Sequence, residues 1–299
     1  MSEPALLQGR IVAAHGRHYS VEMAPRGDIR QCYTRGKRSG LAVGDQVRVR
    51  PEGQEGLIVE VLPRRNLFYR SDANRSKLFA ANIDQLLLVV APEPEFSMDL
   101  VNRALVAAAS AGVPVHILLN KADLPTVAQA RQRLQGLADL GVPITVLSAL
   151  DPAAVRRLLS PLLRNRSSLL LGQSGMGKST LLNALVPEAR AETGALSAAL
   201  GTGRHTTTHT RLHPLPQGGT LIDSPGFQAF GLQHLSAHDV ARGFPELAAA
   251  AEECRFADCR HRHEPGCAVR AGIERGEIQP DRHALYLRIL EENAAGERY

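Results

Sequence analysis

The segment GQSGMGKS at residues 172–179 constrains this chain more than any other feature. It fits the pattern G-x-x-x-x-G-K-[S/T], which forms a phosphate-binding loop when it lies between a strand and a helix. Both neighbours are present, because the apolar run 168–171 precedes the loop and the helical run 180–185 follows it. Backbone N–H groups of such a loop, together with the helix N-terminus, bind phosphate. The chain is therefore predicted to contain an α/β domain that binds a nucleotide.

Two residues of this loop have specific expected roles. Lys178 should reach the β- and γ-phosphates, and Ser179 should ligate Mg²⁺. The residues expected around the phosphates are Gly172, Gln173, Ser174, Gly175, Met176, Gly177, Lys178, Ser179 and Thr180.

The residues before the loop indicate a parallel sheet. Three apolar runs, at 83–91, 113–119 and 142–147, alternate with helical stretches at 99–111, 128–140 and 152–163. Such alternation is typical of βα units. Ligands of these sheets bind at the carboxyl ends of the strands, so we expect the functional motifs there.

A guanine-reading motif, NKAD at residues 120–123, follows the run 113–119. The Asp123 carboxylate can accept hydrogen bonds from the N1–H and the N2 amino group of guanine, a pair of donors that adenine lacks. Asn120 can bind the base and neighbouring loops, and the Lys121 stem can cover the base plane. Two residues after the run 142–147 could complete the pocket. The residues expected at the base are Asn120, Lys121, Ala122, Asp123, Ser148 and Ala149.

The third motif is DSPG at residues 223–226. Asp223 should bind the Mg²⁺ shell, and the Gly226 N–H could sense the γ-phosphate. The segment 187–210 has few large apolar residues, so we expect it to be mobile until a ligand orders it. One of its threonines 206–208, for which we take Thr207, should ligate Mg²⁺. His205 is a candidate to position the attacking water, with His209 as the alternative. A polar linker is the alternative for this segment.

The order of these motifs is unusual. In common GTPases the phosphate loop comes first, whereas here the guanine motif precedes it and DSPG comes last. A circular permutation preserves the site, because domain termini often lie close together. In common GTPases a glutamine after the DxxG glycine orients the attacking water. Phe227 stands in that place and cannot do so.

The first 62 residues indicate a small β-barrel. Short β segments at 10–14, 19–23, 29–34, 46–50 and 57–62 fit an OB-type barrel, and an SH3-like barrel fits nearly as well. Residues 1–77 contain 14 basic and 8 acidic residues, a net charge of +6, whereas the whole chain carries +5. This excess favours an anionic partner such as nucleic acid, although a solvated surface is the alternative. The basic residues expected to contact it include Arg35, Lys37, Arg38, Arg64 and Arg65.

Three of the four cysteines lie close together near the C-terminus. Cys254, Cys259, His261 and Cys267 form a Cys₃His set, which is typical of structural Zn²⁺ with no open coordination position. His263 is an alternative fourth ligand. Helical stretches at 240–253 and 283–293 flank the cluster. No secretory signal or apolar run of about 18 residues is present, so we expect a cytoplasmic protein without a membrane segment.

The motif order NKAD, GQSGMGKS, HTTT, DSPGF and CRFADCRHRHEPGC resembles the RsgA family of ribosome small-subunit-dependent GTPases. The resemblance implies a circularly permuted GTPase domain at 77–232, an N-terminal OB-type RNA-binding barrel at 1–76 and a C-terminal helical zinc domain at 233–299. It also implies a late assembly factor of the small ribosomal subunit that hydrolyses GTP to GDP and binds that subunit's rRNA. We expect a monomer. A nucleotide-gated rRNA-binding module without significant hydrolysis is the alternative.

Overall fold

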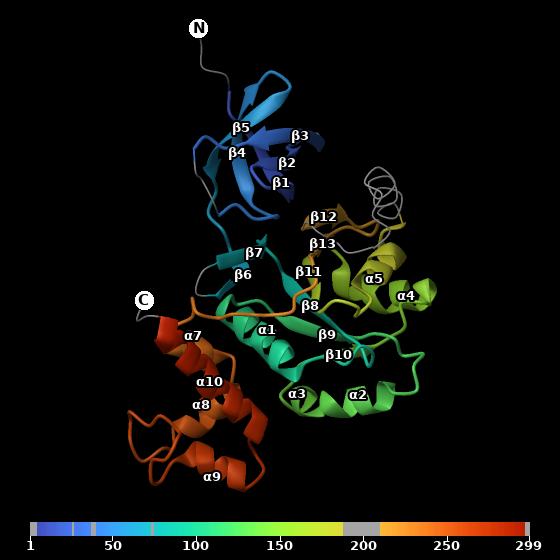
Figure 1. Cartoon of the computed structure of the whole chain (residues 1–299). Coiled ribbons are helices and arrows are strands. Elements are labelled where there is room, and N and C mark those ends of the chain that lie inside the picture. The colour runs from blue at the N-terminus through green and yellow to red at the C-terminus, as the bar shows by residue number, and fades with distance from the viewer. Residues whose placement is uncertain (1–4, 26, 37–39, 73–74, 188–209, 297–299) are drawn as a thin grey trace.

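The computed structural model describes residues 5–296, except for 26, 37–39, 73–74 and 188–209 (Figure 1). Its N-terminal part is a closed barrel in which β1 pairs with both β2 and β4, and β3 pairs with β2 and β5. This arrangement fits the predicted OB-type barrel. The barrel strands are β1 (Leu7–His15), β2 (His18–Met23), β3 (Asp28–Tyr33), β4 (Gln46–Glu52) and β5 (Glu55–Val61).

Alternating side chains form the barrel core. In β4, Val47 and Val49 are fully buried and Arg48 between them is exposed. Successive side chains of a strand point to opposite faces, so this pattern places the apolar residues inside. These apolar barrel side chains belong to the same hydrophobic core as the buried residues of the central sheet.

The central part is a sheet in the order β10-β9-β8-β11-β13-β12, with β12 antiparallel to β13 and the other pairs parallel. Every residue of β8 is buried, which explains its continuous apolar run. The phosphate-loop strand β11 lies between β8 and β13. The sheet strands are β8 (Gln85–Val90), β9 (Val115–Leu119), β10 (Ile144–Val146), β11 (Ser167–Gly172), β12 (Arg211–Pro214) and β13 (Thr220–Asp223).

Helices cover both faces of this sheet. Figure 1 shows α1, α2 and α3 on one side, with α4 and α5 on the other. The single helix expected over 128–140 is in fact two helices, which meet at Leu134. These helices are α1 (Met98–Ser110), α2 (Val127–Arg133), α3 (Gln135–Asp139), α4 (Pro152–Leu163) and α5 (Lys178–Leu185).

A hairpin that the sequence analysis does not predict lies between the barrel and the sheet (Figure 1). Its strands are β6 (Leu67–Asp72) and β7 (Arg75–Ala81). Phe68 and Phe79 are buried with ring centroids 5.9 Å apart, and Phe79 stacks on Phe230 at 5.9 Å. The hairpin is therefore packed against the segment that follows DSPG. A single residue pair, Ala13 with Arg211, also joins barrel strand β1 to β12.

The C-terminal part is helical, as expected. The helix predicted over 240–253 is divided, because Gly243 ends one helix and Pro245 begins the next. Figure 1 shows these helices next to α1, on the far side of the sheet from the barrel. Among the described residues, no helix is long and apolar enough to cross a membrane. The helices are α7 (Ala237–Arg242), α8 (Pro245–Ala251), α9 (Ala268–Glu274) and α10 (Pro280–Gly296).

Candidate nucleotide site and metal centre

The phosphate loop connects β11 to α5, as the motif predicts. Gly175 and Gly177 have φ angles of +83° and +91°, a region that favours glycine. A Cβ atom on Gly172 would lie 2.4 Å from the Val89 carbonyl oxygen, so only glycine allows β11 to approach β8 this closely. The glycines are therefore required by the shape of the loop.

Lys178 lies inside the phosphate loop. Its Nζ donates to the carbonyl oxygens of Gly172 and Gln173 at 2.8 and 2.9 Å. Burial lowers the pKa of this ammonium group, and the Asp223 carboxylate opposes part of that shift. The side chain is thus held as a buried donor at the beginning of α5, where a phosphate would bind.

Asn120 joins the guanine motif to the phosphate loop. The side chain is buried, and its Nδ2 donates to the Met176 carbonyl oxygen at 2.9 Å. Its Oδ1 accepts from the Ala149 N–H at 2.9 Å. One amide side chain therefore holds three loops together, although they are far apart in the sequence.

The other base-reading residues lie around Asn120. The Ser148 hydroxyl donates to the Asp123 carboxylate, and Asp123 itself is exposed. Lys121 has a φ of +61°, and its Nζ donates to the Glu93 carbonyl oxygen at 2.6 Å. Ala122 is fixed by its N–H, which donates to Leu147. The structure thus brings together all the residues that the sequence analysis assigned to the base.

The DSPG motif lies against the phosphate loop. Asp223 is buried at the end of β13, next to β11. A Cβ atom on Gly226 would lie 3.0 Å from the Ser174 nitrogen and 3.2 Å from Lys178 Nζ. The Ser179 hydroxyl, in the first turn of α5, and the Asp223 carboxylate are oxygen ligands that suit Mg²⁺. The Ser179 and Asp223 oxygen atoms, together with the close approach of Gly226 to the phosphate loop, fit a Mg²⁺ ion bound with phosphate.

Phe227 cannot act as a water-orienting residue, because its side chain is apolar. It is buried and packs edge-on against Phe230, with ring centroids 5.3 Å apart. The rest of the predicted switch, including His205 and Thr207, lies outside the described residues.

Sequence reasoning missed the segment 93–97, which follows β8. Pro94 contacts the apex of the phosphate loop, because a Cβ atom on Gly175 would lie 3.0 Å from its ring. The Ser97 N–H donates to Gln173 Oε1 at 2.8 Å. The rule that ligands bind at the carboxyl ends of parallel strands could have pointed to this segment, because it follows one.

The predicted metal ligands converge. The ligand atoms of Cys254, Cys259, His261 and Cys267 all lie within 4.8 Å of one another. His261 directs its Nδ1 at two of the thiols, 3.6 Å from Cys254 Sγ and 3.5 Å from Cys267 Sγ. The four residues could therefore hold a metal ion, and three sulfur atoms with one imidazole nitrogen suit Zn²⁺.

Glu264 shapes the loop that carries these ligands. Its carboxylate accepts hydrogen bonds from the backbone N–H groups of Arg260, Arg262 and His263 at 2.8–3.0 Å. Hydrogen bonds from backbone N–H groups lower the pKa of Glu264 to about 2. His263, the alternative ligand, does not belong to the converging set.

Three arginines that were expected to contact nucleic acid form ion pairs within the protein. Arg64 forms an ion pair with Asp45 at 2.6 Å, and Arg65 with Asp84 at 2.8 Å. Arg35 is paired with Glu52 at 3.3 Å, although its side chain is 72% exposed. Lys37 and Arg38 lie outside the described residues.

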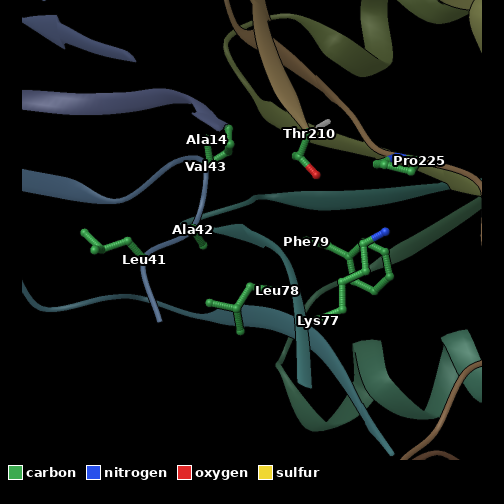
Figure 2. Close-up of a pocket in the computed structure, with 9 residues that line it drawn as sticks. All are labelled: Ala14, Leu41, Ala42, Val43, Lys77, Leu78, Phe79, Thr210 and Pro225. Atoms are coloured by element: carbon green, nitrogen blue, oxygen red, sulfur yellow. The ribbon is translucent and has the colours of Figure 1, made fainter. Parts of the chain in front are cut away.

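A cavity of about 190 Å³ lies where the barrel, the β6–β7 hairpin and the DSPG loop meet, and Figure 2 shows the residues that line it. The Lys77 side chain lines it, opposite Thr210 and Pro225. Burial and the nearby Arg70 lower the pKa of Lys77. Among the described residues, the cavity reaches the DSPG motif through Pro225, which lies between Asp223 and Gly226.

A model of the RsgA GTPase family matches residues 61–233. The chain belongs to this family. Its relatives include the small ribosomal subunit biogenesis GTPase RsgA of Bordetella pertussis, 61% identical over 295 residues and 98% of each chain. The RsgA of Burkholderia pseudomallei strain K96243 is 53% identical over 288 residues, 95% of this chain and 92% of the relative.

Two solved structures are similar to this chain over nearly its whole length. YjeQ from Thermotoga maritima matches with a TM-score of 0.72 and 28% identity, covering 97% of this chain and 99% of the other. YloQ, described as a circularly permuted GTPase, matches with a TM-score of 0.69 and 25% identity, covering 99% and 97%. The circular permutation and the family predicted from the motif order are thus confirmed.

Proposed function

We propose that this chain hydrolyses GTP to GDP and phosphate, and that it acts as a late assembly factor of the small ribosomal subunit, which stimulates the reaction. The observation that supports this best is the position of Asn120. Its bonds to Met176 and Ala149 connect the loop that carries Asp123, the proposed guanine-reading residue, to the phosphate loop. The family and the names of its relatives support the ribosomal role.

In this mechanism the chain supplies position and charge. The Asp123 carboxylate selects guanine, with its orientation set by the Ser148 hydroxyl. Backbone N–H groups of residues 172–180 bind the phosphates, and Lys178 carries the positive charge that neutralises the β- and γ-phosphates. Ser179 and Asp223 would hold Mg²⁺, which adds further positive charge at the phosphates when bound. Gly226 allows its loop to approach the γ-phosphate.

Residues outside the described part complete the proposal. His205 is the candidate that positions the attacking water, and Thr207 is the candidate ligand of Mg²⁺ from the switch segment. We keep these two roles as hypotheses from the sequence.

The C-terminal cluster is proposed as a structural zinc site. Cys254, Cys259, His261 and Cys267 would hold one Zn²⁺ per chain, and most other residues of the segment 252–266 are exposed. Four protein ligands leave no position for substrate, so the metal would stabilise the fold.

The remaining proposals concern partners and organisation. The barrel would contact rRNA through its basic surface, and the chain would act as a cytoplasmic monomer. We divide it into a barrel at 1–76, a permuted GTPase domain at 77–232 and a zinc domain at 233–299.

Phe227 favours a second candidate function, a nucleotide-gated rRNA-binding module without significant hydrolysis. This side chain cannot orient water, and it is buried among other aromatic rings.

One experiment separates the two functions. Phosphate release is measured at matched GTP with small subunits, with large subunits or with neither. The GTPase function predicts slow release alone and faster release with small subunits only. Equal rates in all three samples would favour the gated module, and stimulation by large subunits alone would contradict the ribosomal assignment.

A further inference from the structure

Helix α1 begins at the nucleotide site. Ser97 caps the helix, because its hydroxyl accepts the Leu100 N–H at 3.3 Å. The Ser97 N–H itself donates to the side-chain oxygen of Gln173 at 2.8 Å. Gln173 is the second residue of the phosphate loop, and its own carbonyl oxygen accepts from Lys178. The first turn of α1 is therefore attached to the loop that would hold the phosphates.

Asp99 in this first turn and Arg103 one turn later attach α1 to the C-terminal helix α10. Arg103 is 7% exposed, and its guanidinium donates to both carboxylate oxygens of Glu292 at 2.7 and 2.8 Å. Its Nε donates to Asp99 at 2.7 Å, and Arg288 of α10 also donates to Asp99. Bidentate pairs of this kind fix direction as well as distance.

A second polar cluster joins Asn102 of α1 to the C-terminal helices. Arg282 is 3% exposed and donates to Asn102 at 2.6 Å and to the Gly243 carbonyl oxygen at 3.1 Å. It is also paired with Glu246. A Cβ atom on Gly243 would lie 2.6 Å from Val106, so the backbones are in close contact. Separating these elements would leave buried charges unpaired, which is costly.

We propose that α1 couples nucleotide binding to the C-terminal helices, with Gln173 as the positioning residue that attaches the phosphate loop to α1. The inference rests on the proposed function, because it needs a nucleotide at residues 172–180. Phosphate binding fixes the loop, the loop fixes the Gln173 side chain, and that side chain fixes the first turn of α1. The ion pairs of Arg103 and Asp99 carry the constraint to α10. This route is separate from the covalent connection through DSPG.

Two adjacent residues of α10 provide a matched test. Glu292 pairs with Arg103 of α1, whereas Glu291 pairs at 2.6 Å with Arg262 within the C-terminal part. Their side chains are 38% and 57% exposed, so a Gln substitution at either position should leave the fold intact. Gln173→Leu removes the side-chain oxygen that accepts the Ser97 N–H, so it interrupts the proposed route where α1 meets the phosphate loop.

Hydrogen exchange of the full-length protein is measured with and without saturating GDP. In the unmodified chain, GDP should slow exchange in α10 about five-fold or more, the lower end of typical allosteric coupling. Glu292→Gln should reduce this effect to less than about two-fold while GDP still protects the phosphate loop, and Glu291→Gln should retain it. Gln173→Leu should likewise reduce the effect in α10 at a GDP concentration that saturates this variant.

Three results would overturn the inference. The first is GDP protection of the phosphate loop with no change in α10 of the unmodified chain. The second is an unchanged α10 response in Glu292→Gln. The third is absence of GDP protection at both the phosphate loop and the guanine motif. This result would overturn the proposed function as well. It differs from the other two results because in those GDP still protects the phosphate loop.

Discussion

Replacing Asn120 tests whether one buried amide organises the nucleotide site. Asn120→Ala removes the donor to Met176 and the acceptor of Ala149, two bonds of 2.9 Å in a side chain that is 1% exposed. A buried group left without its hydrogen bond costs about 1–3 kcal/mol, so the two together cost about 2–6 kcal/mol. The phosphate loop and the loop 148–149 would then relax apart. Nucleotide binding must then reorder these two loops, so the free energy lost by the substitution should appear as weaker nucleotide binding.

A cost of about 3 kcal/mol corresponds to roughly a hundred-fold increase in the Kd for GDP, since each 1.4 kcal/mol is tenfold. The assay is titration with a fluorescent GDP analogue, together with urea unfolding of the nucleotide-free protein. Asn66→Ala is the matched control, because Asn66 also donates one bond and accepts one, both with the Ile83 backbone, at 2.8 and 3.0 Å. The control should also lose stability, but less because Asn66 is only partly buried, and it should keep its Kd within about two-fold. Equal Kd values for the two variants would refute the reasoning.

Three further substitutions test separate parts of the molecule. Asp123→Asn should weaken GDP binding and shift preference toward xanthine nucleotides, because one acceptor becomes a donor; comparable affinity of the unmodified chain for ATP and GTP would contradict this. Cys259→Ser should lose the zinc and unfold mainly residues 233–296, because structural zinc supplies on the order of 10 kcal/mol of binding free energy. Metal analysis measures the zinc content of each variant, and Cys32→Ser is the control that keeps the metal. Gly226→Ala should slow GTP turnover about tenfold, or 1.4 kcal/mol, because its Cβ would press on Ser174; an unchanged single-turnover rate would show that the loop moves away freely.

The local patterns predict much of this fold because they depend on near neighbours. Alternation in segments such as 46–50 identifies barrel strands, and the run 83–91 identifies a strand buried on both faces. The phosphate loop and the guanine motif are recognisable because their chemistry needs particular residues at particular spacings. The permutation is evident from motif order alone.

Other features depend on tertiary contacts. The β6–β7 hairpin carries charged residues such as Arg70 and Lys77 beside its buried phenylalanines, which hides its alternation. β12 is four residues long and ends in Pro214, so it gives almost no strand signal. The bond between Gln173 and Ser97 joins residues separated by 76 positions, and no spacing rule connects them.

The position of β11 in the sheet affects how the chain folds while it is being synthesised. β11 pairs with β8, which precedes it, and with β13, which follows it by about fifty residues. During translation the barrel and the guanine motif emerge first, and β11 then waits with one edge uncovered until residue 223 has left the ribosome. Leu169, Leu170 and Leu171 are fully buried in the finished protein, and an apolar strand with an unpaired edge readily pairs with other chains. A released chain that ends between residues 180 and 220 should therefore aggregate, even though it contains all of its base-reading residues.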